Sequence, residues 1–224
     1  MEYIGYVYND FPEKFGLPRQ SGLVPSLKGI IEFVHPYGQK EAFYGLEDFD
    51  YIWILFEFDE AKRDRFCATV KPPKLGGNKH MGVFATRSPF RPNSIGLTSA
   101  KLDSIEYLDN TVKLHVSGID IKNGTPVLDI KPYLPYADSH EGVRAGFTDD
   151  IKLDDMKVEF EDGLIEIIPE DKIECLIDVL RQNPRPGYHD DDNKVYGMYY
   201  MDKNIRFVVN RNNIKVIAIE EIKK

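Results

Sequence analysis

Residues 51–58 read YIWILFEF, a short apolar run rich in β-branched and aromatic side chains. A run of this length and composition predicts a buried β-strand. Up to about residue 136 the chain shows no alternation of strands with helices and no G-x-G-x-x-G motif, so a Rossmann-type fold has no support. A sheet of many short strands that no helices cover can bury its apolar face by closing into a barrel. We therefore predict an N-terminal antiparallel β-barrel. The other strand-like runs in this part are Tyr3–Val7, Gly29–Val34 and Thr111–Ile119.

The chain changes character after residue 138. Polar, turn-forming residues dominate 139–154, which predicts a linker. Beyond the linker, the apolar spacing over Pro169–Arg181 predicts a helix, and Asp162-Gly163 predicts a hairpin turn leading into Leu164–Ile168. We therefore expect a mainly β protein with a barrel domain over 1–138, a linker over 139–154 and a small α+β domain over 155–224. The predicted strands of the last domain are Met156–Phe160, Val195–Tyr200, Ile205–Val209 and Ile214–Ile219.

Composition argues against several classes of protein. No apolar stretch approaches the roughly 18 residues of a membrane span, and the N-terminus lacks the basic and apolar regions of a secretory signal. The two cysteines, Cys67 and Cys175, lie far apart, and the five histidines have no metal-ligand spacing. We therefore expect a cytoplasmic protein without a membrane segment, a disulfide or a metal ion.

Charge is distributed unevenly along the chain. The segment 62–91 holds eight Lys and Arg residues against one Asp, a formal charge of +7. Because the whole chain carries −8, the remainder carries −15. A protein of this kind can bind a polyanion at one face and repel it elsewhere, although a solvated basic loop is an equally simple explanation.

The region Lys71–Leu97 combines this basic charge with many prolines and glycines. Such residues fix the backbone path, so we predict a rigid loop that displays polar groups. Arg87 and Arg91 can each bind a carboxylate or phosphate at two points. The alternative is that both arginines form ion pairs that tie loops together.

Three other segments carry candidate site residues. Asn123-Gly124 predicts a tight hairpin turn, and the nearby Asp129 is flanked by apolar residues. Asp129 can orient a ligand or accept a proton, or it can pair with Lys131. Pro18-Arg19-Gln20 lies on an early loop, where surface exposure explains these residues better than a binding role does. Near the helix end, Arg185 and Tyr188 suit phosphate contact and base stacking, but the prolines around them are also typical of helix termination.

The run GVFATRSPFRPNSIGL at 82–97 resembles the signature of the TrmO (TsaA-like) family of tRNA methyltransferases. The similarity continues through GLPRQSGL at 16–23, WILF at 53–56, KPPKLGGN at 71–78 and the segment 123–136, and it reaches the tail in QNPRP at 182–186 and NIRF at 204–207. It therefore covers nearly the whole chain. Related sequences often carry Asp at the position of Asn123 and Pro at that of Ser94.

The resemblance implies a β-barrel that binds S-adenosylmethionine outside the Rossmann class, and a homodimer. It implies methyl transfer to N6 of threonylcarbamoyladenosine at position 37, in the anticodon stem-loop of tRNA. Asp129 would have a supporting role near the reacting nitrogen or would accept the proton that this nitrogen loses. Cofactor contacts carry over to Pro18, Arg19, Gln20, Asp59, Glu60, Arg87, Leu97, Asn123, Gly124, Thr125 and Pro126. Expected RNA contacts are Lys71, Lys74, Lys79, Arg91, Arg185 and Tyr188.

Two other functions fit the same sequence. One is a barrel that senses S-adenosylmethionine or holds RNA without catalysis. The other is a methyltransferase acting on a small molecule, because cofactor motifs say less about the acceptor than about the donor.

Overall fold

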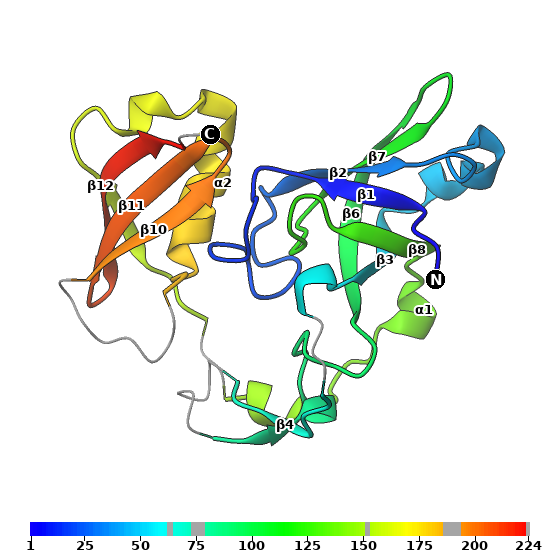
Figure 1. Cartoon of the computed structure of the whole chain (residues 1–224), viewed down its shortest axis with the longest axis horizontal. Helices are drawn as coiled ribbons and strands as arrows, with labels where there is room; N and C mark the ends of the chain where they lie inside the picture. Colours follow the sequence, from blue (N-terminus) through cyan, green and yellow to red (C-terminus); the bar gives the residue numbers. More distant parts are fainter. Residues whose placement is uncertain (62–64, 73–78, 151–152, 186–193, 223–224) are drawn as a thin grey trace.

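A computed structural model of the chain describes residues 1–61, 65–72, 79–150, 153–185 and 194–222. Its N-terminal part is a closed barrel of antiparallel strands in the order β1-β2-β7-β6-β3-β8 (Figure 1). The prediction of a non-Rossmann antiparallel barrel is thus confirmed. The strands are β1 (Gly5–Tyr8), β2 (Lys28–Phe33), β3 (Tyr51–Glu57), β6 (Ile95–Tyr107), β7 (Val112–Ser117) and β8 (Pro126–Pro132).

Alternation of side chains builds the barrel interior. In β3, Ile52, Ile54 and Phe56 point inward and are buried, while the residues between them face outward. In β7, the inward residues Val112 and Leu114 are completely buried. Each such aliphatic side chain stabilises the fold by about 1.5–3 kcal/mol.

The longest strand, β6, is one that the sequence patterns did not predict. Its inward residues are Gly96, Thr98, Ala100 and Leu102, so only the last is a large apolar side chain. A Cβ atom on Gly96 would lie 2.3 Å from Cζ of Phe56, which shows that the Phe56 ring fills the space above this glycine. The small inward residues of β6 are therefore complementary to large ones on β3.

The C-terminal part is a four-stranded sheet, in the order β10-β11-β12-β9, packed against one helix (Figure 1). The helix α2 (Glu170–Arg181) buries Leu176, Val179 and Leu180. The predicted α+β fold is confirmed, but Asp162-Gly163 does not form a hairpin. Residues 165–167 form a 3-10 helix, and the preceding strand pairs in parallel with β12. The strands are β9 (Lys157–Phe160), β10 (Val195–Tyr200), β11 (Lys203–Asn210) and β12 (Asn213–Glu221).

The loop between β1 and β2 joins the barrel to the C-terminal sheet. The rings of Phe11 and Tyr200 lie 5.1 Å apart, and both side chains are completely buried. A carboxylate oxygen of Asp10 lies 2.6 Å from Nζ of Lys172 on α2. The buried apolar residues of both parts form one continuous cluster.

Within the described residues, no helix is long and apolar enough to cross a membrane.

Short elements occupy the connections between the strands and helices named above. The short elements are η1 (Lys40–Phe43), η2 (Leu46–Asp48), η3 (Asp59–Ala61), β4 (Thr69–Val70), β5 (Met81–Gly82), η5 (Val83–Ala85), α1 (Pro135–Asp138), η6 (Gly146–Thr148) and η7 (Ile165–Ile167).

Three long connections leave the barrel at the same end. The strand registers place the end of β1, the start of β2, the end of β3, the start of β6, the end of β7 and the start of β8 together. The connections 9–27, 58–94 and 118–125 therefore meet there, and we call this end the barrel mouth. Nearly all of the predicted cofactor residues lie on these three connections.

Candidate active site at the barrel mouth

Two of the connections meet through Gln20 and Arg87. The guanidinium of Arg87 donates a hydrogen bond to the side-chain oxygen of Gln20, and the side-chain nitrogen of Gln20 donates to the carbonyl oxygen of Arg19 over 2.5 Å. Nη2 of Arg19 in turn donates to the carbonyl oxygen of Arg185 over 3.3 Å. The structure thus brings together two predicted cofactor segments and one predicted RNA-binding residue.

The segment Asn123–Pro126 forms the tight turn that the sequence predicts, but not a hairpin. Gly124 has a φ of 79°, which favours glycine, and the strands on either side of the turn, β7 and β8, are not neighbours in the barrel. The turn instead pairs with β1 and with the start of the first connection. The backbone N–H of Asn9 donates to Oδ1 of Asn123 over 3.0 Å, and the N–H of Gly124 donates to the carbonyl oxygen of Val7 over 2.7 Å. An Asp at position 123 would offer the same acceptor oxygen.

The third predicted segment, Asp59-Glu60, lies on the 3-10 helix that follows β3. The carboxylate of Glu60 forms an ion pair with Lys122, next to the turn at Asn123. This contact lowers the pKa of Glu60, so the carboxyl stays ionised at neutral pH. The pair connects the second and third connections of the mouth.

Asp120 is a site residue that the sequence patterns missed. Its Oδ1 atom accepts a hydrogen bond of 2.6 Å from the hydroxyl of Thr98, a buried side chain of β6. The backbone N–H of Ser21 and the positive charge of Arg87 also favour the ionised form of this carboxyl and lower its pKa. Burial nevertheless raises the pKa of Asp120 above its ordinary value. A polar residue between two isoleucines was the available signal, but the same pattern occurs in any half-buried strand.

Arg91 differs from Arg87 in its contacts. Its Nη1 atom donates to the carbonyl oxygens of Val83 and Thr86, over 3.2 and 2.8 Å, and its guanidinium lies over the ring of Phe84 at 5.7 Å. Arg91 therefore stabilises the turn that presents Arg87. Its predicted contact with RNA stays a prediction.

Leu97 and Asp129 lie on the outer surface of the barrel. Both are register partners of Leu55 on β3, one from β6 and one from β8, so the three residues form a row. Leu97 is 57% exposed. Asp129 pairs with Nζ of Lys131 over 2.7 Å, which is the structural alternative that the sequence left open. Neither residue belongs to the hydrogen-bonded group at Gln20 and Arg87, and the catalytic role of Asp129 stays a prediction.

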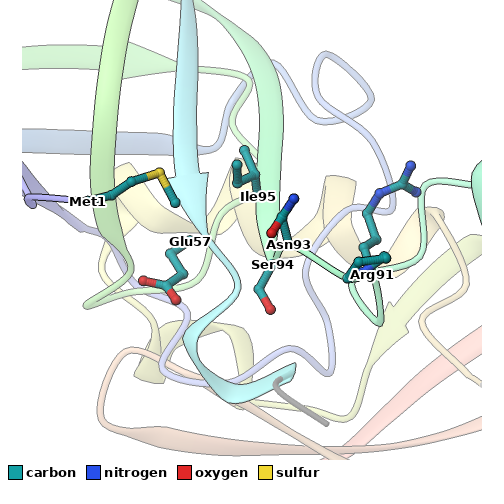
Figure 2. Close-up of a pocket in the computed structure, with 7 residues that line it drawn as sticks. Met1, Glu57, Arg91, Asn93, Ser94 and Ile95 are labelled. Carbon is teal, nitrogen blue, oxygen red and sulfur yellow. The ribbon is translucent and has the colours of Figure 1, made fainter. Parts of the chain in front are cut away.

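A cavity of about 330 Å³ lies beside the row of Leu55, Leu97 and Asp129, where β3 ends and β6 begins (Figure 2). The Glu57 carboxylate and the Ser94 hydroxyl point to the same side of it, while the guanidinium of Arg91 turns away. Its remaining lining residues are Met1, Pro92, Asn93 and Ile95.

The predicted RNA-binding residues are placed only in part. Lys71 and Lys79 are exposed on the connection that contains β4 and β5. Lys74 and Tyr188 lie outside the described residues.

In the described part of the chain, no three His, Cys, Asp or Glu side chains gather as metal ligands.

Comparisons with known proteins agree with this architecture. A family model for the tRNA-methyltransferase O N-terminal domain matches residues 6–139, and one for the TrmO C-terminal domain matches residues 154–222. The chain belongs to the TrmO family. The resemblance seen in the sequence is thereby confirmed.

Two curated relatives and a crystal structure match this TrmO family member over nearly its full length. It is 39% identical to the tRNA (adenine(37)-N6)-methyltransferase of Escherichia coli, over 98% of this chain and 97% of the relative. It is 38% identical to a putative S-adenosylmethionine-dependent methyltransferase of Pseudomonas aeruginosa, over 91% and 90%. A crystal structure of TrmO from Pseudomonas aeruginosa superposes with a TM-score of 0.80 at 33% identity, covering 98% of this chain and 95% of that one.

Proposed function

We propose that this protein transfers the methyl group of S-adenosylmethionine to N6 of threonylcarbamoyladenosine at position 37 of tRNA. The full-length similarity to the tRNA (adenine(37)-N6)-methyltransferase of Escherichia coli carries this proposal. The barrel mouth supports it, because three connections bring Gln20, Arg87 and the turn at Asn123 to one end of the fold.

The residues of the mouth fit the chemical groups of the cofactor. Arg87 is exposed and offers a guanidinium for the methionyl carboxylate, and Gln20 offers an amide beside it. We propose that the cofactor is held by Pro18, Arg19, Gln20, Asp59, Glu60, Arg87, Leu97, Asn123, Gly124, Thr125 and Pro126.

S-adenosylmethionine supplies a methyl group on a positively charged sulfur, which also provides the leaving group. The protein therefore has to align the acceptor nitrogen, keep water away and take up one proton from N6. We propose that Asp129 accepts this proton, since it lies in the same outer row as Leu97. Full turnover in Asp129→Asn would remove this role, whereas slow turnover with unchanged cofactor affinity would support it.

We propose that the anticodon stem-loop is held by the cations Lys71, Lys74, Lys79, Arg91 and Arg185, together with Tyr188, whose ring suits base stacking. Exchanging Lys71 and Lys79 for Glu should weaken tRNA binding and flatten its salt dependence, because each phosphate contact releases counterions. Lys113→Glu, at the opposite end of the barrel, is the control that matches the charge change of either single exchange.

We further propose a homodimer in the cytoplasm. The rings of Phe66 and Phe84 stack on each other with centroids 6.4 Å apart, yet they are 62% and 71% exposed. Exposed aromatic pairs of this kind are typical of contact surfaces. Analytical ultracentrifugation should give a dimer for the wild type and a monomer for Phe66→Ser/Phe84→Ser; a monomeric wild type would refute the dimer.

One experiment separates this function from its two alternatives. The protein is incubated with labelled S-adenosylmethionine and tRNA that carries or lacks threonylcarbamoyladenosine, and the nucleosides are analysed by mass spectrometry. Methylation of the modified tRNA alone is expected. Cofactor binding without transfer would indicate a sensor, and transfer to small molecules only would indicate a different acceptor.

A further inference from the structure

A series of hydrogen bonds runs from the barrel mouth to the C-terminal domain. Arg87, on the connection between β3 and β6, donates to Gln20, and Gln20 donates to the carbonyl oxygen of Arg19 over 2.5 Å. Nη2 of Arg19 then donates to the carbonyl oxygen of Arg185, just beyond the end of α2, over 3.3 Å. The series therefore joins three proposed cofactor residues to one residue proposed to contact RNA.

The guanidinium groups in this series are not neutralised by carboxylates. Arg87 donates to an amide oxygen and Arg19 to a carbonyl oxygen. Arg185 is half-buried, and its Nη1 atom has no hydrogen-bond partner among the described residues. In that part of the chain none of the three forms an ion pair, whereas Arg181 at the end of α2 pairs with Asp155 over 2.7 Å. Arg185 therefore keeps the capacity to bind an anion such as a phosphate group.

The connection between β1 and β2 is anchored to α2 near both of its ends. Near its start Asp10 pairs with Lys172 over 2.6 Å, and near its end Ser26 donates to Asp178 over 2.5 Å. The middle of the connection, which carries the proposed cofactor residues, is held by the carbonyl oxygen of Arg185. Because both ends are fixed to the helix, a change in the segment after the helix acts mainly on the middle of the connection.

The backbone shortly before Arg185 has a conformation that few residues adopt. Asn183 has a φ of 51°, in the left-handed region, and its N–H donates to the carbonyl oxygen of Leu180 over 2.9 Å. Its side-chain oxygen is buried and makes no hydrogen bond within the described ranges. Tolerance of this φ is thus the main contribution of Asn183, which sets the direction in which the chain leaves α2.

We infer that tRNA and S-adenosylmethionine bind this protein cooperatively, because a tRNA phosphate bound by Arg185 fixes the carbonyl oxygen that orients Arg19 in the cofactor site. This inference rests on the proposed function. The phosphate offers an acceptor to the unpaired nitrogen of Arg185, and the segment that it orders holds Arg19 in one direction. A site oriented in advance loses less conformational entropy when its ligand binds, so each ligand raises the affinity for the other.

The test measures the Kd for S-adenosylmethionine by calorimetric titration of the full-length protein, alone and saturated with tRNA. The tRNA lacks threonylcarbamoyladenosine, so that no methyl group is transferred during the titration. We expect tRNA to lower the wild-type Kd about fivefold, and saturating S-adenosylmethionine to lower the Kd for tRNA by the same factor.

Arg185→Gln removes the guanidinium and keeps the carbonyl oxygen that holds Arg19. Both factors should fall to about one in this variant, since tRNA no longer fixes the segment. Arg181→Gln is the matched control, because it removes the same charge from the end of α2 and leaves the series of hydrogen bonds intact. It should keep the coupling.

A second pair of variants keeps the Arg185 side chain. Asn183→Gly preserves the left-handed conformation and should keep the coupling. Asn183→Val disfavours that conformation, so it should abolish the coupling and weaken the binding of S-adenosylmethionine even without tRNA. Titration well below the lowest Tm of the set keeps every variant folded. If Arg185→Gln binds too little tRNA for titration, the two Asn183 variants decide.

Several outcomes would overturn the inference. They are equal wild-type Kd values with and without tRNA, a wild type that binds S-adenosylmethionine but not this tRNA, coupling that persists in Arg185→Gln, or equal coupling in the two Asn183 variants. If that wild type methylates tRNA that carries threonylcarbamoyladenosine, the proposed function stands. A wild type that does not bind S-adenosylmethionine would overturn both.

Discussion

Gly96 shows how one residue without a side chain shapes the barrel interior. A Cβ atom there would lie 2.3–2.7 Å from three carbons of the Phe56 ring, and that ring packs against Phe58 with centroids 4.9 Å apart. The ring cannot move without disturbing the core at the mouth. The role of Gly96 is therefore steric, and its φ angle does not require glycine.

We predict that Gly96→Ala destabilises the protein by about 1–3 kcal/mol, as overpacking of a core does. Gly82→Ala is the control, since Gly82 has a φ of −57° and open space around its Cβ position. Urea unfolding followed by circular dichroism measures both. Equal stability of the two variants would contradict the steric role of Gly96.

The two cysteines should differ in reactivity. Burial raises the pKa of the Cys175 thiol to about 12, whereas Cys67 is exposed, and both are free. Since the thiolate is the reactive form, a disulfide reagent at pH 8 should modify Cys67 quickly and Cys175 only after denaturation. The measurement is the number of thiols titrated per chain, one when folded and two in guanidinium. Two fast thiols in the folded protein would mean that Cys175 is accessible.

At the scale of elements, the connection between β1 and β2 is held by the sheet and the helix of the C-terminal domain. Gly16 has a φ of 99° and lies against Met198 of β10, and Ser26 donates to the Asp178 carboxylate of α2 over 2.5 Å. The same connection carries Arg19 and Gln20. Support of this proposed cofactor loop therefore depends on β10 and α2, which contribute no predicted cofactor residue.

We predict that Gly16→Ala lowers Tm and weakens the binding of S-adenosylmethionine. A Cβ atom would lie 2.1 Å from Sδ of Met198, so the connection must move away from the sheet. Gly22→Ala on the same connection is the control, because its φ of 77° carries similar backbone strain while its surroundings are open. If both variants bind the cofactor equally well, packing against β10 does not support the loop.

At the scale of the whole molecule, the barrel and the C-terminal domain share one core. The Phe11–Tyr200 contact lies between them, together with the ion pair of Asp10 and Lys172. The single tryptophan, Trp53, belongs to the barrel, where its Nε1 donates to Asp138 over 2.8 Å. Its fluorescence therefore reports on the barrel alone, whereas circular dichroism reports on both parts.

We predict one cooperative unfolding transition, with coincident midpoints by Trp53 fluorescence and circular dichroism. Leu176→Ala on α2 should cost about 2–5 kcal/mol, because this side chain is completely buried. The fluorescence midpoint should shift as far as the dichroism midpoint. A shift in dichroism alone would show that the two domains unfold independently.

The sequence by itself determined the class of the fold and the strongest elements. The apolar run at β3 and the spacing along α2 identify buried elements because each buries large side chains at a regular period. Family resemblance identified the segments of the mouth. These inferences depend on residues close together in the chain.

Only the tertiary structure decided which elements are neighbours. It showed that β6 is a strand, although Gly96, Thr98 and Ala100 leave its apolar period weak, because the large partner side chains come from β3. It also showed that the turn at Gly124 joins strands that do not pair, because barrel closure places β1 and β3 beside β8. The hydrogen bond between Thr98 of β6 and Asp120 joins two separate segments of the barrel, and no local pattern contains it.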